Sequence, residues 1–237
     1  MALHPQTQEL LDQINEAVAP PAWEQPLDEL RVDFNKFVIS LQKPGPQLKR
    51  VKNRDIPGPH GPIPVRIYWP DDVSDRPFPI LVHFHSGGFV VLGLDSHDNG
   101  CRELCARAGC IVVAVNYRKA PENTFPKPTD DAWAATKWAA DNCAELGGDA
   151  NRMAVCGDSA GGCLAAVVAQ RARGEDGLNI VFQLLVCPVT DMTDDTDSYR
   201  KFADGYNLTA DMMRWFIRLY LNNDSEKTNP TAAPLRA

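Results

Sequence analysis

The most constraining feature of the sequence is an alternation of short apolar runs with amphipathic segments across residues 63–189. Apolar runs of this length, rich in β-branched residues, are typical of strands that are covered on both faces. Strands that alternate with helices predict a mostly parallel sheet with right-handed crossovers and helices on both faces, which is an α/β fold. The predicted strands of this kind are 78–84, 110–117, 153–157 and 180–189, whereas 63–69 alternates like a half-buried strand. The predicted helices between the strands are 97–108, 128–145 and 160–173.

Further helices are predicted on both sides of this alternating region. Apolar residues recur at helical spacing in 10–18 and again in 27–41. The prolines at 20–21 separate these two helices, because proline cannot continue a helix interior. Residues 44–64 are rich in proline and glycine and predict turns, whereas 209–221 predicts one more amphipathic helix.

The charge and the cysteines limit the environment of the protein. A net charge of −7 repels phosphate backbones and anionic lipid, so we expect neither nucleic acid nor a membrane surface as a partner. The basic run 48–54 is interpreted as a solvated strand edge.

Residues 1–10 lack the apolar region of a signal peptide, and no apolar run is long enough to span a bilayer. The seven cysteines form no C-x-x-C pair and mostly lie in apolar runs, so we expect reduced core cysteines and a cytoplasmic location.

The segment GDSAG at 157–161 places a G-x-S-x-G pattern between a predicted strand and a predicted helix. In a nucleophile elbow, a serine, here Ser159, occupies a strained turn that exposes its hydroxyl, and the glycines let strand and helix approach closely. The helix N-terminus adds unpaired N–H groups where an oxyanion would form. Taken alone, the pattern also fits a glycine-rich turn with a capping serine. Gly162 excludes the S-x-x-K pattern of β-lactamases, and no G-K-[ST] of a P-loop is present.

A second motif, HSGG at 85–88, follows the predicted strand 78–84 and resembles the H-G-G-G segment of lipases and esterases. We expect the backbone amides of Gly87 and Gly88, together with that of Ala160, to stabilise an oxyanion, at roughly 3–4 kcal/mol for each donor. A plain Gly-Gly turn after a strand is the alternative. Both motifs occur in the order that a hydrolase requires, which favours the joint interpretation.

The segments HSGG, VNYRKAPENTFPKPTDDAWAATKW (115–138) and GDSAGG together resemble the hormone-sensitive-lipase-like family of bacterial carboxylesterases. The resemblance runs from about residue 5 to the end of the chain. It implies an α/β-hydrolase fold, short-chain ester substrates and no metal or organic cofactor. It also implies a helical cap made from residues 1–45 and 194–223, around a core of 46–193 to which 224–237 returns.

The resemblance further suggests that Asp158 and Glu122 brace the elbow and the neighbouring loop, with ordinary turn carboxylates as an equal alternative. His85 is expected to shape the oxyanion loop, with a role as substitute base as the lesser alternative. Ser86 stands where the family has glycine. Its effect should be mild because the function rests on backbone amides, although a side chain there could narrow the site.

In this fold the acid and the histidine base follow the serine along the chain. Residues 229–237 resemble the family's stretch just before the strand that precedes the acid, so the chain is expected to stop short of both groups and of the last strands. We therefore expect an unpaired edge strand and an apolar helix face, to which a complementing C-terminal fragment or a second copy could dock. All histidines precede Ser159: His4, His60, His83, His85 and His97.

The sequence thus predicts a carboxylic ester hydrolase that acts on a small-molecule ester through a serine acyl-enzyme on Ser159. Without a triad acid and base, residues 1–237 are expected to turn over poorly. One alternative is a triad-less module of the same fold that binds a small ligand under the cap. Another is a folding fragment without function.

Overall fold

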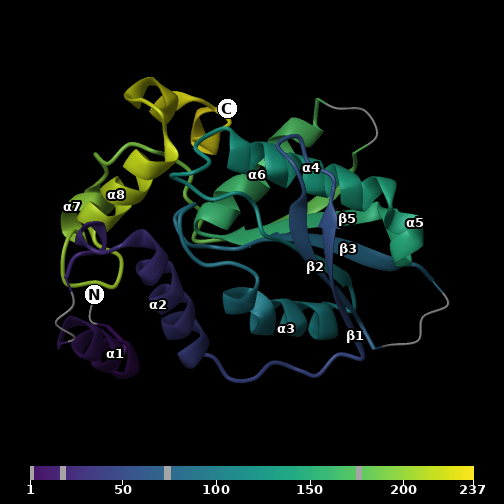
Figure 1. The fold of residues 1–237 in the computed structure, drawn as a ribbon, viewed down its shortest axis with the longest axis horizontal. Helices are drawn as coiled ribbons and strands as arrows, with labels where there is room; N and C mark the ends of the chain where they lie inside the picture. The colour runs from purple at the N-terminus through teal and green to yellow at the C-terminus, as the bar shows by residue number, and fades with distance from the viewer. Residues whose placement is uncertain (1–2, 17–19, 72–75, 175–177) are drawn as a thin grey trace.

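The computed structural model describes residues 3–16, 20–71, 76–174 and 178–237 (Figure 1). Val18, part of the first predicted helical repeat, lies outside these residues. The strands are β1 (Arg50–Ile56), β2 (Ile63–Trp69), β3 (Phe78–Phe84), β4 (Ile111–Val115), β5 (Gly148–Asp158) and β6 (Ile180–Val186). The α-helices are α1 (Pro5–Glu16), α2 (Leu27–Ser40), α3 (Asp98–Ala108), α4 (Lys127–Asp141), α5 (Cys143–Leu146), α6 (Ala160–Ala172), α7 (Asp197–Lys201) and α8 (Ala210–Tyr220). Short 3-10 turns are η1 (Ala22–Glu24), η2 (Asp95–His97), η3 (Asp224–Thr228) and η4 (Pro234–Arg236).

One six-stranded sheet runs through the protein in the order β1-β2-β4-β3-β5-β6. The four strands β4, β3, β5 and β6 pair in parallel, as the strand–helix alternation predicted. Antiparallel pairing joins β1 to β2 and β2 to β4, so a hairpin extends the sheet at one edge. The mostly parallel α/β fold is therefore confirmed.

Alternate residues of the central strands face two separate helical layers. Val82, Val113 and Val155 belong to the large core cluster that includes α4 and α6. The neighbours Leu81 and Cys156 point to the opposite face, where they pack against buried cysteines of α3. Both faces of these strands are covered by helices, and this explains why their sequences are continuous apolar runs. Figure 1 shows α3 on one side of the sheet and α4 and α6 on the other.

Three segments differ from the predictions. The helix predicted at 128–145 is interrupted at Asn142 and forms α4 and α5. Residues 44–64, predicted as turns, contain β1, which has one buried residue and therefore carries no apolar periodicity. Its basic part is the solvated strand edge that the charge pattern indicated. The run 180–189 was predicted as a strand covered on both faces, but Val181, Phe182, Leu184 and Val186 of β6 are between 37% and 60% exposed. The expected unpaired edge strand is present, since within the described residues β6 has a neighbouring strand on one side only.

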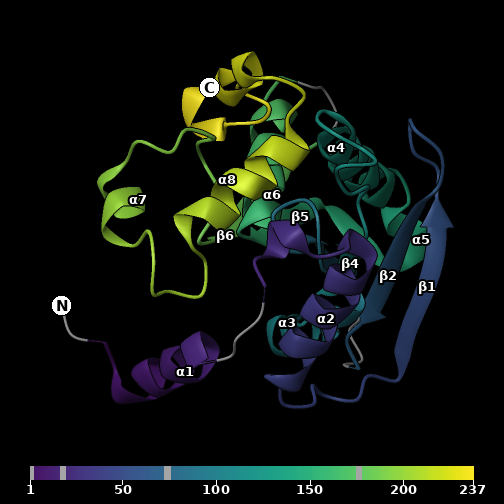
Figure 2. The same ribbon diagram turned by 60° about the vertical axis from the view of Figure 1, so that its left-hand side comes forward.

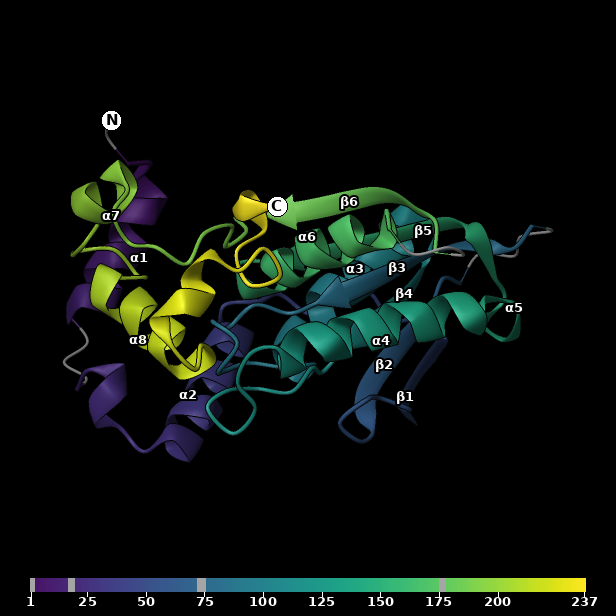
Figure 3. The ribbon, with the colours of Figure 1, turned by 90° about the horizontal axis from the view of Figure 1, so that it is seen from above.

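The helices α1, α2, α7 and α8, with η1, lie together beyond one end of the sheet (Figures 2 and 3). We call this group the helical lobe. Leu30 of α2 and Phe216 of α8 join the large core cluster, so α2 and α8 are packed onto the sheet domain. Among the described residues, no helix has the length and apolarity needed to cross a membrane.

Candidate active site

Ser159 lies in the tight turn between β5 and α6 and has φ 54°, ψ −116°. A positive φ is uncommon for a residue with a side chain, and it persists only where the surroundings fix it. Here the Ser159 N–H donates to the carbonyl of Val186 at 2.9 Å, and the Ser159 carbonyl accepts from the N–H of Val189 at 3.1 Å. The turn is therefore held in place by the chain that leaves β6.

Glycines on both sides of Ser159 permit the close approach that this turn needs. A Cβ added to Gly157 would overlap the carbonyl of Gly161, and one added to Gly161 would overlap the carbonyl of Phe84. These obstacles are backbone atoms, which cannot move aside as a flexible side chain would. The glycine requirement inferred from the G-x-S-x-G pattern thus has a steric cause in β3, β5 and α6.

The loop after β3 brings Gly87 and Gly88 to the same cavity as Ser159. Both glycines have positive φ, at 112° and 58°. The carbonyl of Gly87 accepts from the N–H groups of Val90 and Val91, which closes the loop into a tight turn. Within the described residues, no hydrogen bond is recorded from the amide of Gly87 or Gly88. Two unpaired donors in an apolar cavity favour an anion or a polarised oxygen.

Side chains of α8 pack against this loop. Phe89 stacks on Tyr220 with ring centroids 3.8 Å apart, and the ring of Phe216 lies against Gly88. Tyr220 in turn contacts the hydroxyl of Thr129 at 3.2 Å. The helical lobe therefore supports the loop that carries the two free amides, a contact that the sequence motifs did not indicate.

The cavity at Ser159 has a volume of about 250 Å³ and a mostly apolar lining. Its floor is formed by Ser159, Asp158 and residues of the 86–92 loop, and its roof comes from α2 and α8. Ala160 opens α6 behind the serine and its side chain is fully buried. A neutral, largely apolar ligand fits this lining better than a charged one. The roof residues are Phe34, Phe37, Val38, Met212, Met213, Phe216 and Ile217.

His85 lies beneath the loop, where it is 1% exposed and stacked on Tyr117 at 4.2 Å. The His85 Nδ1 is 2.7 Å from the carbonyl of Ser86, and Tyr117 donates its hydroxyl to the carbonyl of His85 at 2.8 Å. Burial, followed by the charge of Lys119, holds the pKa of His85 well below its usual value. His85 is thus a neutral, packed side chain under the loop, an arrangement that favours a shaping role over that of a base.

Asp158 contacts His97, which lies in η2. The Asp158 carboxylate is 3.5 Å from Nε2 of His97, and the hydroxyl of Ser86 is 3.0 Å from the same nitrogen. Burial raises the pKa of Asp158, but the hydrogen bond and charge of His97 outweigh it and leave that pKa below the usual value. Ser86 stands where the family motif has glycine. Through His97, its hydroxyl connects the loop after β3 to Asp158, the residue before Ser159.

The stability of the protein should depend on pH through His83, a buried residue of β3. Burial and then the charge of His97 lower the pKa of His83 to about 4. A histidine with a lowered folded pKa contributes stability above its unfolded pKa near 6.5, and that contribution is lost as pH falls towards 4. We expect the free energy of unfolding to fall by about 2 kcal/mol between pH 7 and pH 5. Urea denaturation of His83→Gln should show less of this loss, and an equal loss in variant and parent would contradict the assignment.

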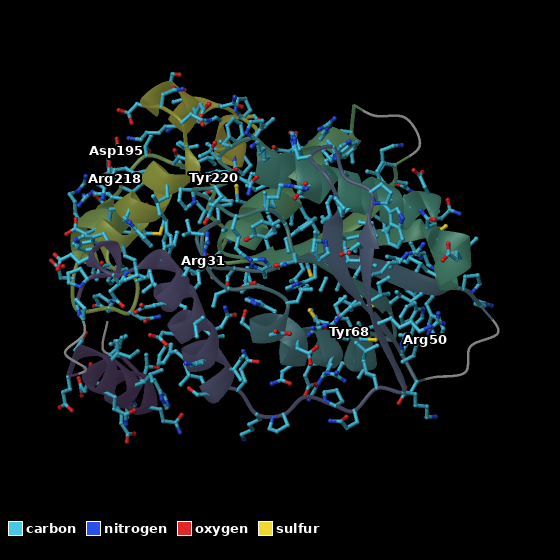
Figure 4. All side chains as sticks on the ribbon, in the orientation of Figure 1. Arg31, Arg50, Tyr68, Asp195, Arg218 and Tyr220 are labelled. Atoms are coloured by element: carbon cyan, nitrogen blue, oxygen red, sulfur yellow. The ribbon has the colours of Figure 1, made fainter. Side chains whose placement is uncertain are left out.

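Glu122 lies away from the elbow and contacts α2 instead. Arg31 of α2 donates to both carboxylate oxygens of Glu122, at 2.8 and 2.7 Å. It also donates to the carbonyls of Val90 and Ala120, at 2.9 and 2.8 Å. Figure 4 labels Arg31 between α2 and the sheet domain. Through Arg31, Glu122 therefore contacts the helical lobe and the end of the loop after β3, and not the turn at Ser159.

Loss of this contact should destabilise the protein more than loss of an ordinary surface pair. Arg31→Ala removes a bidentate ion pair and two bonds to carbonyls, and we expect about 1–3 kcal/mol lower stability in chemical denaturation. Arg31→Lys should recover only part, because an ammonium cannot bind bidentately. The matched control is Lys36→Ala on the same helix, whose 3.7 Å pair with Asp33 is largely exposed. Similar losses of stability for Arg31→Ala and Lys36→Ala would show that the hydrogen bonds of Arg31 stabilise the protein no more than an exposed ion pair does.

No described histidine completes a catalytic pair with Ser159, since no hydrogen bond from the Ser159 hydroxyl to a histidine is recorded. Asp191, which follows β6, pairs with Arg236 at 2.6 Å and not with a histidine. In the part of the chain that the structure describes, no group of three or more His, Cys, Asp or Glu side chains is placed to hold a metal ion. The site therefore supplies a strained serine, two free amides and an apolar cavity.

Comparison with known proteins supports the fold described above. A family model described as alpha/beta hydrolase fold matches residues 81–237. The chain is similar to esterase LipI of Mycobacterium tuberculosis, with 46% identity over 79% of this chain and 59% of the relative. It is also similar to a gibberellin receptor of Oryza sativa subsp. japonica, with 34% identity over 72% of this chain and 49% of the relative.

A solved ester hydrolase from the metagenome of Lake Arreo, in complex with a bipyridine phosphonate derivative, has the same fold with a TM-score of 0.94. The sequences are 37% identical, and the match covers 100% of this chain and 76% of that structure. The chain spans about half the length of the curated relatives it matches.

Proposed function

The chain belongs to the α/β-hydrolase fold family, with bacterial carboxylesterases among its relatives, and from that premise we propose that it carries the nucleophile and oxyanion site of a carboxylic ester hydrolase. The observation that carries the proposal is the strained Ser159 beside the unpaired amides of Gly87 and Gly88 in one apolar cavity. A turn that only capped α6 would not need a positive φ at the serine or two free donors opposite it.

In the proposed reaction the Ser159 oxygen attacks the ester carbonyl and gives its proton to a base. The carbonyl oxygen becomes negative, and the amides of Gly87, Gly88 and Ala160 stabilise it because they are already in place. Collapse of the tetrahedral intermediate breaks the bond to the alkoxy group, which leaves as an alcohol after protonation. Water then hydrolyses the acyl-enzyme by the same route.

The base and its orienting acid are proposed to come from residues outside 1–237. His85 is buried under the loop after β3, His97 contacts Ser86 and Asp158, and His83 is buried on β3 beside His97. Within the described residues, none of these three histidines has a hydrogen bond to the Ser159 hydroxyl. The exposed apolar side chains of β6 support the same proposal, because an edge strand of this kind readily pairs with a further strand. A complementing C-terminal segment is therefore the proposed partner of β6, with a homodimer as the alternative.

Residues 1–45 and 194–223 are proposed to act as a cap over this site, with residues 46–193 as the core to which 224–237 returns. Their helices α2 and α8 supply the apolar roof of the cavity, which suits a small neutral ester. The five buried free cysteines fit a reducing compartment, so we place the protein in the cytoplasm.

The proposed function is tested by hydrolysis of p-nitrophenyl esters from acetate to decanoate. Residues 1–237 should be assayed beside the longest natural form of the protein that contains them. Rates should be low for 1–237 and several orders of magnitude higher for the longer form, because a triad lacking its base keeps only the catalysis of oxyanion hole and binding. Equal rates would overturn the proposal that outside residues supply the base, and an absence of hydrolysis by either form would overturn the ester hydrolase itself.

A second candidate is a module that binds a small ligand in the same cavity without hydrolysis. The similarity to a gibberellin receptor and the lack of a histidine at the Ser159 hydroxyl favour it. A fluorophosphonate separates the two, because a base-activated serine reacts covalently and a binding-only pocket does not. A third candidate, a folding fragment without function, would show exposed apolar surface and aggregation in size exclusion.

A further inference from the structure

One histidine ring contacts both ends of the loop after β3. Nε2 of His97 accepts from the Ser86 N–H at 3.3 Å, and Nδ1 lies 3.3 Å from the carbonyl oxygen of Gly93. The side chain of His97 is 14% exposed, so water competes little for these contacts. His97 therefore closes the base of the loop that carries the free amides of Gly87 and Gly88.

The ring of His97 is itself fixed by Ser96 of η2. The Ser96 hydroxyl accepts from the Gly93 N–H at 3.0 Å and donates to the Gly93 carbonyl at 2.9 Å. The same oxygen lies 3.0 Å from Nδ1 of His97, and Ser96 is 1% exposed. Rotation of the ring would leave buried polar groups without partners, which is unfavourable in free energy. His97 is therefore a fixed anchor for the loop.

The peptide unit between Ser86 and Gly87 is held from both of its sides. Its carbonyl oxygen lies 2.7 Å from Nδ1 of His85, which is buried beneath the loop. On the other side of Ser86, the N–H donates to His97 and the hydroxyl lies 3.0 Å from the same Nε2. This peptide unit is trans and planar, so the Gly87 N–H points away from the carbonyl that His85 contacts. The contacts of Ser86 therefore determine the direction of the Gly87 N–H.

Among these contacts, that of the hydroxyl is the one that requires serine at position 86. A glycine there would keep the N–H contact to His97, which is long for a hydrogen bond, and would lose the contact at 3.0 Å. The hydroxyl also binds Asp158: burial raises the pKa of this carboxyl, and hydrogen bonds from His97 and Ser86 lower it below its usual value. Since Asp158 directly precedes Ser159, one hydroxyl links the loop to the turn of the nucleophile.

We propose that Ser86 is a positioning residue of the hydrolase, whose hydroxyl, bound to His97 and Asp158, orients the Ser86–Gly87 peptide so that the Gly87 N–H stabilises the oxyanion. The proposal rests on the proposed function, since the oxyanion forms at Ser159. It differs from the mild effect expected for a serine in the H-G-G-G position. The side chain of Ser86 acts through the backbone amide that follows it, and it does not touch the ester.

Steady-state kinetics test this role in the longest natural form of the protein, with p-nitrophenyl butyrate as substrate. Ser86→Ala should lower kcat by about 10–100-fold, because a small displacement of an oxyanion donor is costly. KM should change by less than about twofold, since the oxyanion exists only in the transition state and its intermediate. An unchanged kcat, or a loss that lies in KM, would overturn the positioning role.

Thr136→Val is the matched control for loss of a buried hydroxyl. The Thr136 hydroxyl donates to the carbonyl of Ala132 at 2.8 Å within α4 and has no recorded contact with the loop after β3. Thr136→Val should keep kcat within about twofold of the parent even where it lowers stability. An equal fall of kcat in Thr136→Val and Ser86→Ala would show that general destabilisation explains the effect.

A double-mutant cycle tests whether the hydroxyl acts through His97. In the parent background Ser86→Ala should have its full effect on kcat, whereas in a His97→Gln background it should lower kcat by less than about threefold further. Residues that act through one shared contact give such non-additive effects. Additive effects of the two substitutions would contradict the link between Ser86 and His97.

Hydrogen exchange tests the anchoring of the loop without catalysis. The N–H groups of Val90 and Val91 both donate to the Gly87 carbonyl at 2.9 Å, so their exchange rates report opening of the loop. These two rates should rise by about tenfold in Ser86→Ala and stay unchanged in Thr136→Val. Unchanged exchange in Ser86→Ala would show that the hydroxyl does not hold the loop.

Failure of the positioning role and failure of the hydrolase give different results. Faster exchange in Ser86→Ala, with no ester hydrolysis by any form of the protein, would overturn the hydrolase and with it the catalytic role of Ser86, and would leave only an anchored loop. Ester hydrolysis that Ser86→Ala leaves unchanged would keep the hydrolase and remove the role of Ser86.

Discussion

Ser159→Ala is expected to abolish covalent reaction with a fluorophosphonate and to reduce ester hydrolysis by the longer protein on the order of 10⁶-fold. The effect is this large because the hydroxyl forms the bond to the acyl group, and neither the oxyanion amides nor the cavity can replace it. Folding stability should change by less than about 1 kcal/mol, since alanine and serine meet similar strain at φ 54°. Intact mass and peptide mapping measure the labelling, and urea denaturation measures the stability.

The control for this prediction is the exposed thiol of Cys187, which directly follows β6. Cys187→Ala should keep full labelling at Ser159, because the thiol is not part of the oxyanion site. Labelling that survives Ser159→Ala and disappears in Cys187→Ala would show that the reactive group is the thiol of Cys187.

Gly88→Ala should produce the second large effect. Gly88 has φ 58°, and an added Cβ would overlap the ring of Phe216, which is packed in the core. The variant must therefore shift either the amide at position 88 or the roof of the cavity. Loss of one oxyanion donor costs about 10²–10³-fold in kcat. We expect a loss of at least this size, measured as initial rates with a p-nitrophenyl ester.

Gly109→Ala is the matched control for backbone strain. Gly109 also has φ 58°, but it ends α3 and an added Cβ would meet nothing within 4 Å. Both substitutions cost about 1–2 kcal/mol for the left-handed conformation. Only Gly88→Ala should lower the rate and the affinity for apolar ligands. Equal loss of activity in both variants would mean that stability alone, and not the oxyanion geometry, explains the effect.

The strand bounds of β2 and β3 and the place of Ser159 followed from the sequence because local pattern determines them. The strand β2 alternates as a half-buried strand does, whereas β3 is a continuous apolar run. A strained serine turn needs glycines where backbone meets backbone. The same reasoning placed Gly87 and Gly88 opposite the serine, since parallel strands β3 and β5 end at the same edge of the sheet.

Contacts between distant segments could not be predicted in this way. Arg31 lies 59 residues from Val90, and nothing in the periodicity of α2 marks it as the partner of Glu122. The link between Asp158 and His97 has the same origin, because it joins the elbow to η2. The strand β1 could not be predicted either, because it is mostly exposed and its sequence lacks the apolar alternation by which a strand is recognised.

The geometry at Ser159 is tested most directly by a crystal structure of the protein after reaction with a phosphonate. We expect a phosphorus–oxygen bond to Ser159 and a phosphonyl oxygen about 2.7–3.1 Å from the amide nitrogens of Gly87 and Gly88. The alkyl substituent of the phosphonate should point towards α2 and α8. A phosphonyl oxygen turned away from both glycines, or a phosphonate attached to another residue, would show that Ser159 and the two glycines do not form an acyl-transfer site.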